Sequence, residues 1–543
     1  MHESNGVVGG ERLLLSGDEA IALGALHAGV GLATGYPGTP STEILETLDR
    51  LGGPAQWAPN EKVAFEVGLG AAYGGASALV TMKHVGVNVA ADPLFTATYT
   101  GVQGAFVLVS ADDPGLASSQ NEQDNRRYAV AAVVPMLEPA DSQEAYDYTL
   151  AAFALSRRIG QPVMLRVTTR VCHSKGVVRP AGPQPPPPAP NFVRNIPARV
   201  MVPGYARPAH RRLRATIAEL AEWAETTDLN RIEGPARAPL GIICAGISYA
   251  HVVEAAPEAA ILKLGLSYPL PERLIREFVA AHERIVVIEE GDPYLADAIR
   301  AWGLNVEAKA EMYRFGELSV ARVRRILARD ESPEPAPAPQ KPPALCDGCP
   351  YRRVFTVLRE LDCIVSGDIG CYTLGALEPF AAMDSQSCMG ASLGVGVGLR
   401  HVLPPDQAKR VVSIIGDSTF VHSGLTGLVE MCYNKPPGGH VLIILDNGTT
   451  AMTGRQEHPG TGRLLNHEPT AKLDIEALCR AIGVDEVTTI DGHGDPDGFR
   501  ELVAGALGDG RLHVIISQRP CLLAAAQIRE YEKLAQLGVC DNG

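Results

Sequence analysis

Short apolar runs rich in β-branched residues recur along the chain, and segments with helical periodicity separate them. Examples are ALVTM at 78–82, AFVLVSA at 105–111, GIICAG at 241–246, RVVSIIGD at 410–417 and HVLIILDN at 440–447. This alternation is typical of parallel sheets, because neighbouring parallel strands need a crossover connection that is usually a helix. Ligands of open parallel sheets bind at the carboxyl ends of the strands. We therefore expect α/β domains whose chemistry lies in the polar residues that follow these runs.

Two proline-rich stretches, within 179–191 and 331–344, interrupt this pattern. With 543 residues the chain is too long for a single hydrophobic core. The composition of both stretches predicts extended linkers. We expect three parallel-sheet α/β domains, at 8–178, 236–330 and 345–535. A linker with a basic helical arm at 179–235 and a second linker at 331–344 would join them.

The net charge and the distribution of apolar residues argue against a nucleic-acid-binding, secreted or membrane-spanning protein. A formal net charge of −14 argues against a nucleic-acid partner, because phosphate contacts need clustered Lys and Arg. The first residues lack the pattern of a secretory leader, and no apolar run approaches the ~18 residues of a membrane span. We expect a cytoplasmic protein that does not bind membranes. Its 11 cysteines are then expected to be reduced, buried or metal-bound.

Asp417 ends one apolar run and precedes a helix-like segment, and Asn447 follows the next run. A carboxylate beside the free N–H groups of a helix N-terminus suits a diphosphate bridged by Mg²⁺. Asn447 could supply a neutral oxygen ligand to the same ion. The alternative is that Asp417 only caps the helix.

Cys346 and Cys349 form a Cys-x₂-Cys pair directly after the second linker. A single pair of this kind is compatible with zinc, redox and structural roles. Cys371 and Cys521 each follow a predicted strand, so they can converge with the pair at one edge of a sheet.

The GDS at 416–418 with LDN at 445–447 resembles the thiamine-diphosphate motif, Gly-Asp-Gly followed about thirty residues later by Asn. Ser418 stands where many thiamine enzymes have Gly. Almost the whole chain, about 10–535, resembles the large subunits of the indolepyruvate:ferredoxin oxidoreductases, a branch of the 2-oxoacid:ferredoxin oxidoreductases. The resemblance implies pyrimidine-binding, transketolase-C-like and diphosphate-binding domains, in that order. It assigns Mg²⁺ to Asp417, Asn447 and the carbonyl of Thr449, and it adds Gly416 and Ser418 to these as residues that bind the cofactor.

The same resemblance covers GYPGTPSTEI at 35–44 and the segment at 60–88. It places the catalytic glutamate, which hydrogen-bonds the aminopyrimidine of the cofactor, at Glu61, whereas Glu66 is interpreted as a helix-surface residue. Thr39 matches a threonine near the cofactor or substrate. His84 could transfer protons or bind the substrate carboxylate, with a structural histidine as the alternative. The polar segment at 110–126 resembles the substrate-side loop of the family.

The resemblance also matches four cysteines to the ligands of a proximal [4Fe-4S] cluster: Cys346, Cys349, Cys371 and Cys521. A Cys₄ zinc site is the alternative. The best-known large subunits of the family continue into a C-terminal ferredoxin-like domain, whereas this sequence has no further Cys-x₂-Cys-x₂-Cys runs. A small γ-type second subunit, ferredoxin or another electron acceptor, and a dimer of heterodimers are implied.

The expected reaction is oxidative decarboxylation of an aryl 2-oxo acid resembling indolepyruvate. Electrons would leave through the cluster, and coenzyme A or water would receive the acyl group. One alternative is a non-oxidative thiamine-dependent decarboxylase, which needs no cluster. A second is a catalytically silent scaffold or electron-transfer subunit, against which Glu61, Asp417 and Asn447 argue.

Overall fold

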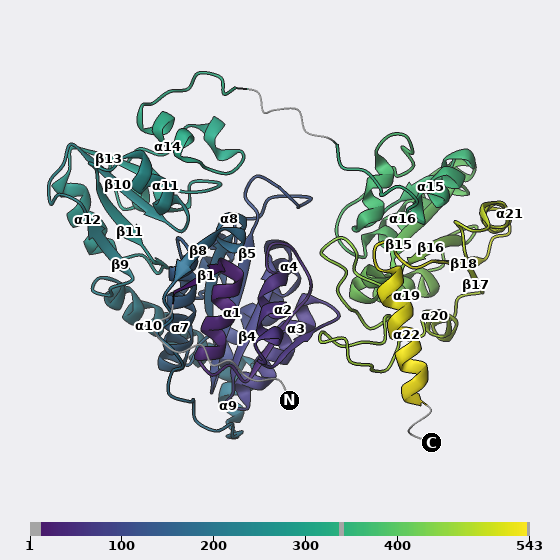
Figure 1. Cartoon of the computed structure of the whole chain (residues 1–543), viewed down its shortest axis with the longest axis horizontal. Coiled ribbons are helices and arrows are strands. Elements are labelled where there is room, and N and C mark those ends of the chain that lie inside the picture. Colours follow the sequence, from purple (N-terminus) through teal and green to yellow (C-terminus); the bar gives the residue numbers. More distant parts are fainter. Residues whose placement is uncertain (1–11, 336–341, 540–543) are drawn as a thin grey trace. The chain divides into compact units, whose positions relative to one another are not determined.

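The computed structural model describes residues 12–335 and 342–539. The centre of the expected second linker, 336–341, and the first residues of the expected domain at 8–178 lie outside this part. The chain forms two compact units, Met1–Pro335 and Ala336–Gly543 (Figure 1). The sheets are mostly parallel, which confirms the predicted multidomain α/β class.

A seven-stranded sheet forms the centre of the first unit, in the order β12-β6-β7-β5-β4-β2-β3. Every strand is parallel to its neighbours except β12, which runs antiparallel to β6. The strands are β2 (Leu32–Gly35), β3 (Ala55–Trp57), β4 (Ser77–Lys83), β5 (Ala105–Asp112), β6 (Met136–Leu137), β7 (Val163–Thr168) and β12 (Leu266–Tyr268). All residues of β4 and β5 are buried, which explains their continuous apolar sequences.

Helices connect and cover these strands. They are α1 (Gly17–His27), α2 (Thr42–Arg50), α3 (Glu61–Tyr73), α4 (His84–Val89), α5 (Ala91–Thr100), α6 (Arg126–Ala132), α7 (Ser142–Ile159) and α8 (Thr169–His173). Asn60 caps α3, since its side chain accepts a hydrogen bond from the Val63 amide. A two-stranded antiparallel pair, β1 (Leu13–Ser16) with β8 (Lys175–Val178), lies beside this sheet. The Asn60 cap places Glu61 at the start of α3, and the end of β4 places Lys83 and His84 at the edge of the sheet.

The segment after β8 is irregular up to two helices, α9 (Ile196–Arg199) and α10 (Pro203–Ala224). A four-stranded sheet in the order β13-β10-β11-β9 follows. Its strands are β9 (Asn230–Glu233), β10 (Leu240–Ala245), β11 (Ala260–Leu264) and β13 (Arg284–Ile288), with only β9 antiparallel. The sheet thus begins before residue 236, the boundary expected from the sequence.

This second sheet is not separate from the first. β12 comes from the expected middle domain yet pairs with β6 of the seven-stranded sheet. One hydrophobic cluster includes Phe65 and Met164 from the first region and Ile243 and Phe278 from the second. The helices around the second sheet are α11 (Ser248–Ala255), α12 (Glu272–Ala281), α13 (Tyr294–Ala301), η1 (Glu311–Arg314) and α14 (Val320–Leu327). A shared core therefore holds the first two regions together.

The second unit contains a five-stranded parallel sheet in the order β14-β15-β16-β18-β17. Its strands are β14 (Ile364–Ser366), β15 (Val411–Gly416), β16 (His440–Asp446), β17 (Glu486–Ile490) and β18 (Leu512–Gln518). Alternate residues enter two cores, with Ile414, Ile443 and Ile515 in one and Ile415, Ile444 and Ile516 in the other. The sheet is therefore covered on both faces, as a parallel sheet requires.

The helical elements of this unit are α15 (Tyr351–Glu360), η2 (Cys371–Ala376), α16 (Ala391–Val402), α17 (Pro405–Ala408), α18 (Asp417–Thr419), η3 (Phe420–Gly424), α19 (Leu425–Tyr433), α20 (Ile475–Ile482), α21 (Pro496–Ala506) and α22 (Ala525–Val539). A π-helical turn, η3, joins α18 to α19. Within residues 12–335 and 342–539, no helix has the length and hydrophobicity needed to cross a membrane.

Candidate active site

The first group of site residues lies where β15 ends at Gly416 and a helix begins at Asp417. The Asp417 carboxylate is buried and accepts hydrogen bonds of 2.9 Å from the amides of Ser418 and Gly448. Its Oδ2 lies 3.2 Å from Nε2 of His458. Burial alone would raise the pKa of Asp417, but the His458 imidazole and the Ser418 amide hold it below its ordinary value. Asp417 is thus a buried, charged oxygen donor.

Asn447 and Thr449 follow the neighbouring strand β16, and both are buried. β15 and β16 are paired in parallel with Gly416 opposite Leu445, so their carboxyl ends meet. The Asn447 Oδ1 accepts a 3.0 Å hydrogen bond from the Thr449 amide, and the Ser418 hydroxyl accepts one of 2.9 Å from Thr450. The structure thus brings the five predicted residues from 416 to 449 to one edge of the sheet. Carboxylate, amide and carbonyl oxygens are the ligands that Mg²⁺ prefers.

Two further polar residues, Asp446 and His458, belong to this edge and were not predicted as site residues. Burial and the negative charge of Asp417 raise the pKa of Asp446 to about 6. The buried carboxylate of Asp417 and the half-buried carboxylate of Asp446 repel each other, and a cation between them would offset this repulsion. Asp446 could have been found, because it ends an apolar run as Asp417 does. His458 lies in a loop without periodicity, and nothing in its sequence context marks it.

The four predicted cluster ligands line one cavity of about 90 Å³, which Asn447 also lines. Cys346 and Cys349 precede α15, Cys371 opens η2 after β14, and Cys521 follows β18. Burial, together with the neighbouring thiols, raises the pKa of Cys371 to about 11. Burial raises the pKa of Cys349 to about 11 as well. The fold therefore gathers cysteines separated by up to 175 residues in the sequence, from 346 to 521.

The distances between these thiols indicate which metal centre they could bind. Among the described residues, one group of His, Cys, Asp or Glu side chains places three possible metal-ligand atoms within 4.8 Å of one another. That group contains no cysteine. Hence no three of the four Sγ atoms lie that close together. Thiolates around one zinc ion, each about 2.3 Å from it in a tetrahedron, would lie about 3.8 Å apart.

Glu61, in the first unit, is the first residue of α3 and is buried. The backbone of α4 packs against its side chain at Gly86, where an added Cβ would lie 2.6 Å from the Glu61 Cγ. Glu66 is exposed one turn later and pairs with Lys62. The structure thus distinguishes a packed, buried glutamate from one on the helix surface.

Lys83 and His84 lie at the carboxyl end of β4, and both are buried. Lys83 donates a 2.6 Å hydrogen bond to the Ser118 carbonyl, and His84 Nε2 lies 3.0 Å from the Asn121 carbonyl. Burial lowers the pKa of both side chains. His84 is therefore neutral, with its proton on Nε2 toward the carbonyl oxygen. Its buried Nδ1 has no hydrogen-bond partner among the described residues and can accept a proton.

Thr39 lies in the loop between β2 and α2 and is half-buried. This loop runs close to β4, since a Cβ added to Gly38 would lie 3.2 Å from the Lys83 Cβ. The Gly38 amide also donates a 3.0 Å hydrogen bond to Thr42 Oγ1. Thr39 and the end of β4 therefore belong to the same region of the first unit.

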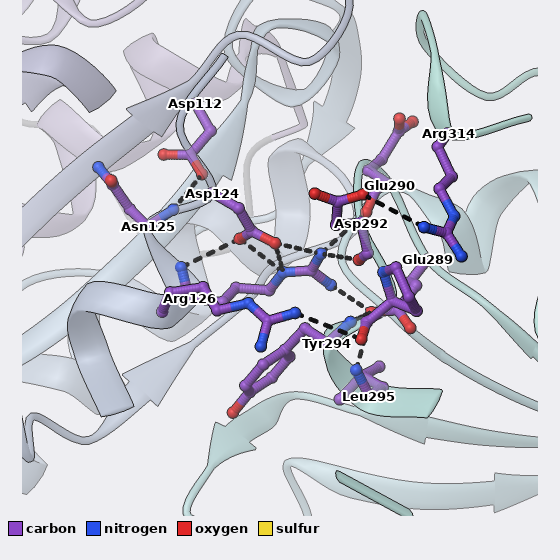
Figure 2. A network of polar contacts seen from close by, with 12 residues as sticks. Asp112, Asp124, Asn125, Arg126, Glu289, Glu290, Asp292, Tyr294, Leu295 and Arg314 are labelled. Atoms are coloured by element: carbon purple, nitrogen blue, oxygen red, sulfur yellow. Dashed lines mark hydrogen bonds and ion pairs between the residues drawn. The ribbon is translucent and has the colours of Figure 1, made fainter. Parts of the chain in front are cut away.

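The segment 113–125, which carries the carbonyls that contact Lys83 and His84, is anchored by buried charges (Figure 2). Arg126 pairs with Asp124 at 2.7 Å and with Glu289 at 2.6 Å. Asp112 pairs with Arg166 at 2.7 Å and accepts a hydrogen bond from the Asn125 amide. The sequence marked the segment at 110–126 as polar, but Glu289 lies more than 160 residues away, and no local signal predicts that contact.

Two protein-family models match parts of the chain. Residues 23–186 match the family described as pyruvate flavodoxin/ferredoxin oxidoreductase, thiamine diphosphate-binding. Residues 368–517 match the thiamine pyrophosphate enzymes, C-terminal TPP-binding domain. These ranges include the edges that hold Glu61 and Asp417.

The chain is 39% identical to the indolepyruvate oxidoreductase subunit IorA of Archaeoglobus fulgidus, over 96% of this chain and 88% of that protein. The chain belongs to the IorA family. The subunit IorA of Pyrococcus horikoshii is 37% identical, over 95% of this chain and 86% of that protein. Membership confirms the predicted family and identifies the chain as a thiamine-diphosphate-dependent 2-oxoacid oxidoreductase.

The fold is also found among solved structures. One of them is a 2-oxoglutarate:ferredoxin oxidoreductase from Magnetococcus marinus, with 2-oxoglutarate, coenzyme A and succinyl-CoA bound. The TM-score is 0.50 at 16% identity, and the match covers 59% of this chain and 65% of that chain. At this identity the match concerns the fold alone.

Proposed function

We propose that the chain catalyses the oxidative decarboxylation of an aryl 2-oxo acid resembling indolepyruvate. Cys346, Cys349, Cys371 and Cys521 would hold a [4Fe-4S] cluster that would supply one-electron redox chemistry, and coenzyme A or water would take the acyl group. The observation that carries this proposal is the single cavity lined by the four cysteines and by Asn447. A purely non-oxidative decarboxylase has no use for four thiols beside its cofactor-binding edge.

Gly416, Asp417, Ser418, Asn447 and the carbonyl of Thr449 would hold Mg²⁺ and the diphosphate of the cofactor. In support, these five residues offer oxygen donors, and the lowered pKa of Asp417 keeps its carboxylate charged. Burial and the neighbouring Asp417 carboxylate raise the pKa of Asp446, and a divalent ion would offset the repulsion between the two carboxylates. Bound thiamine diphosphate supplies the carbon nucleophile and electron sink that decarboxylation of a 2-oxo acid requires.

Glu61 would place its carboxyl group against the aminopyrimidine of the cofactor. Its packing against Gly86 limits the positions that the side chain can adopt, and this orients the carboxyl group for proton exchange. His84 would accept a proton, or a hydrogen bond from the substrate, at Nδ1. Thr39, from the loop beside Lys83, would contact the cofactor or substrate.

No three of the four Sγ atoms lie within 4.8 Å of one another, which supports a cluster of several iron ions over a single zinc ion. With pKa values near 11, Cys349 and Cys371 are protonated without a metal at neutral pH. Cluster binding must therefore displace protons from these thiols. We expect cluster assembly to be favoured at higher pH.

The relatives' name describes IorA as a subunit of indolepyruvate oxidoreductase. By analogy we propose a small γ-type second subunit, a dimer of heterodimers, and ferredoxin or another protein as the electron acceptor. These partners are the ones that the resemblance to the family implies.

The reaction can be tested with the chain and its second subunit under anaerobic conditions. Indolepyruvate, pyruvate and 2-oxoglutarate would each be supplied with ferredoxin, with and without coenzyme A. We expect ferredoxin reduction with indolepyruvate and formation of an arylacetyl product. Release of an arylacetaldehyde without ferredoxin reduction would establish the non-oxidative alternative instead.

A further inference from the structure

Three side chains that have no part in the proposed reaction converge in the first unit. They are Asp18 in the first turn of α1, Glu43 in the first turn of α2, and His173 at the end of α8. One ligand atom from each lies within 4.8 Å of the other two. The Glu43 Oε2 is 3.9 Å from the His173 Nε2. The three elements are far apart in the sequence, so the fold itself creates this group.

Asp18 is the unusual member of the group. Its side chain is 0% exposed, yet neither carboxylate oxygen has a hydrogen-bond partner in the described residues. A buried carboxylate without partners is costly, and a nearby second carboxylate adds repulsion. Burial, and next the negative charge of Glu43, raise the pKa of Asp18 well above its ordinary value, while the neighbouring Cys172 thiol lowers it. The group is therefore incomplete as it stands.

We propose that Asp18, Glu43 and His173 bind a divalent transition-metal ion of the zinc class. Two carboxylates and one imidazole are a donor set for such ions, whereas Mg²⁺ and Ca²⁺ prefer oxygen alone. The ion satisfies the oxygens of Asp18 and offsets the repulsion between the two carboxylates. Glu43 and His173 are 48% and 41% exposed, which leaves the ion a path from solvent and a position for water.

The ion would tie together the ends of three helices. α1 contacts both α2 and α8, and α2 begins directly after the loop that holds Thr39. Metal binding would therefore stiffen this loop without touching the substrate. The inference uses none of the residues assigned to thiamine diphosphate or to the cysteine cavity, so it does not depend on the proposed function.

The site can be tested by counting zinc ions on the full chain. Protein treated with a chelator would be incubated with Zn²⁺, separated from free ions, and analysed for zinc per chain. The variants are Glu43→Gln and His173→Gln, both at exposed positions. Glu46→Gln, one turn further along α2, is the matched control. Zinc bound by the cysteines is common to all four proteins and cancels in the comparison.

We expect wild type and Glu46→Gln to bind one more zinc ion per chain than Glu43→Gln and His173→Gln. We also expect Zn²⁺ to raise the melting temperature of wild type and Glu46→Gln more than that of Glu43→Gln and His173→Gln. Equal zinc content in all four proteins, or a shift shared by all four, would overturn the proposal. Either result would leave Asp18 and Glu43 as a carboxyl pair that shares a proton.

Discussion

The backbone amide of Cys521 donates a 2.9 Å hydrogen bond to the carbonyl oxygen of Asn447. One residue is a proposed cluster ligand and the other a proposed Mg²⁺ ligand. Asn447 follows β16 and Cys521 follows the neighbouring strand β18, and the Arg519 amide donates a similar hydrogen bond to the Asp446 carbonyl. Backbone hydrogen bonds therefore join the proposed cofactor-binding segment after β16 to the segment after β18 that carries one proposed cluster ligand.

Substitution of Asp417 by Asn should weaken binding of thiamine diphosphate with Mg²⁺. Asn keeps the shape of the side chain but removes the charge that the ion requires. We expect the affinity for thiamine diphosphate to fall about 10-fold to 100-fold or more. A loss of that size is typical even when a residue that only hydrogen-bonds a metal ligand is removed. Calorimetric titration of the cofactor measures it. Asp406→Asn, at an exposed position of α17, is the control and should bind as wild type does.

Substitution of Glu61 by Gln should reduce turnover far more than cofactor affinity. The amide cannot exchange a proton as the carboxyl group does, and general acid–base groups contribute about 10²-fold to 10⁴-fold to rates. Anaerobic turnover and cofactor titration would be measured on the same preparation. Glu66→Gln removes a carboxylate from the exposed surface of the same helix. A similar fall in both variants would contradict the role of Glu61.

Substitution of Arg126 by Met should destabilise the first unit. It leaves the buried Glu289 carboxylate without its cation and Asp124 with only Arg166, 3.8 Å away; loss of one partner of a buried pair typically costs about 3–5 kcal/mol. Denaturant unfolding followed by fluorescence would measure it. Arg127→Met is the matched control, because Arg127 is half-exposed and its nearest carboxylate is 3.9 Å away. We expect the control to change stability by less than about 0.5 kcal/mol.

His440 should make the stability of the second unit depend on pH. Its Nε2 lies 2.8 Å from the Ser413 hydroxyl, and burial followed by the charge of Arg400 lowers its pKa to about 3. Because the unfolded chain binds the proton near pH 6.5, the stability from neutral His440 is complete above that pH. It is lost at about 1.4 kcal/mol per pH unit as the pH falls toward 3.

The measurement is the pH dependence of unfolding in wild type and in His440→Gln. The glutamine can still donate a hydrogen bond to Ser413, but it does not titrate. Between pH 6.5 and pH 4.5 the variant should lose less stability than wild type. Identical slopes would show that His440 does not take up a proton on unfolding.

Local patterns predicted the class of fold and the two strands, β15 and β16, that precede Asp417 and Asn447. β15 and β16 are continuous buried apolar runs, and the polar residues that follow them led to the expectation that Asp417 and Asn447 lie at the carboxyl ends of neighbouring strands. The edge strands were harder to predict. β9 and β12 have only four and three residues, and their partners are set by packing that no short window contains. This is why the expected boundary at 236 differs from the start of the four-stranded sheet.

Long-range contacts explain the remaining differences. His458 beside Asp417 and Glu289 beside Arg126 come from segments whose own sequences carry no signal of the partner. The convergence of Asp18, Glu43 and His173 likewise depends on how three helices pack around the sheet. Roles carried over from the family, such as those of Thr39 and His84, remain predictions.

The most direct test of the electron path is the iron and acid-labile sulfide content of anaerobically purified protein, with an EPR spectrum before and after addition of indolepyruvate. We predict about four iron and four sulfide ions per chain, as in a [4Fe-4S] cluster, and a signal of the reduced cluster that appears only with substrate and thiamine diphosphate. A protein that contains zinc or no metal in the cysteine cavity, and that still decarboxylates indolepyruvate, would contradict the account.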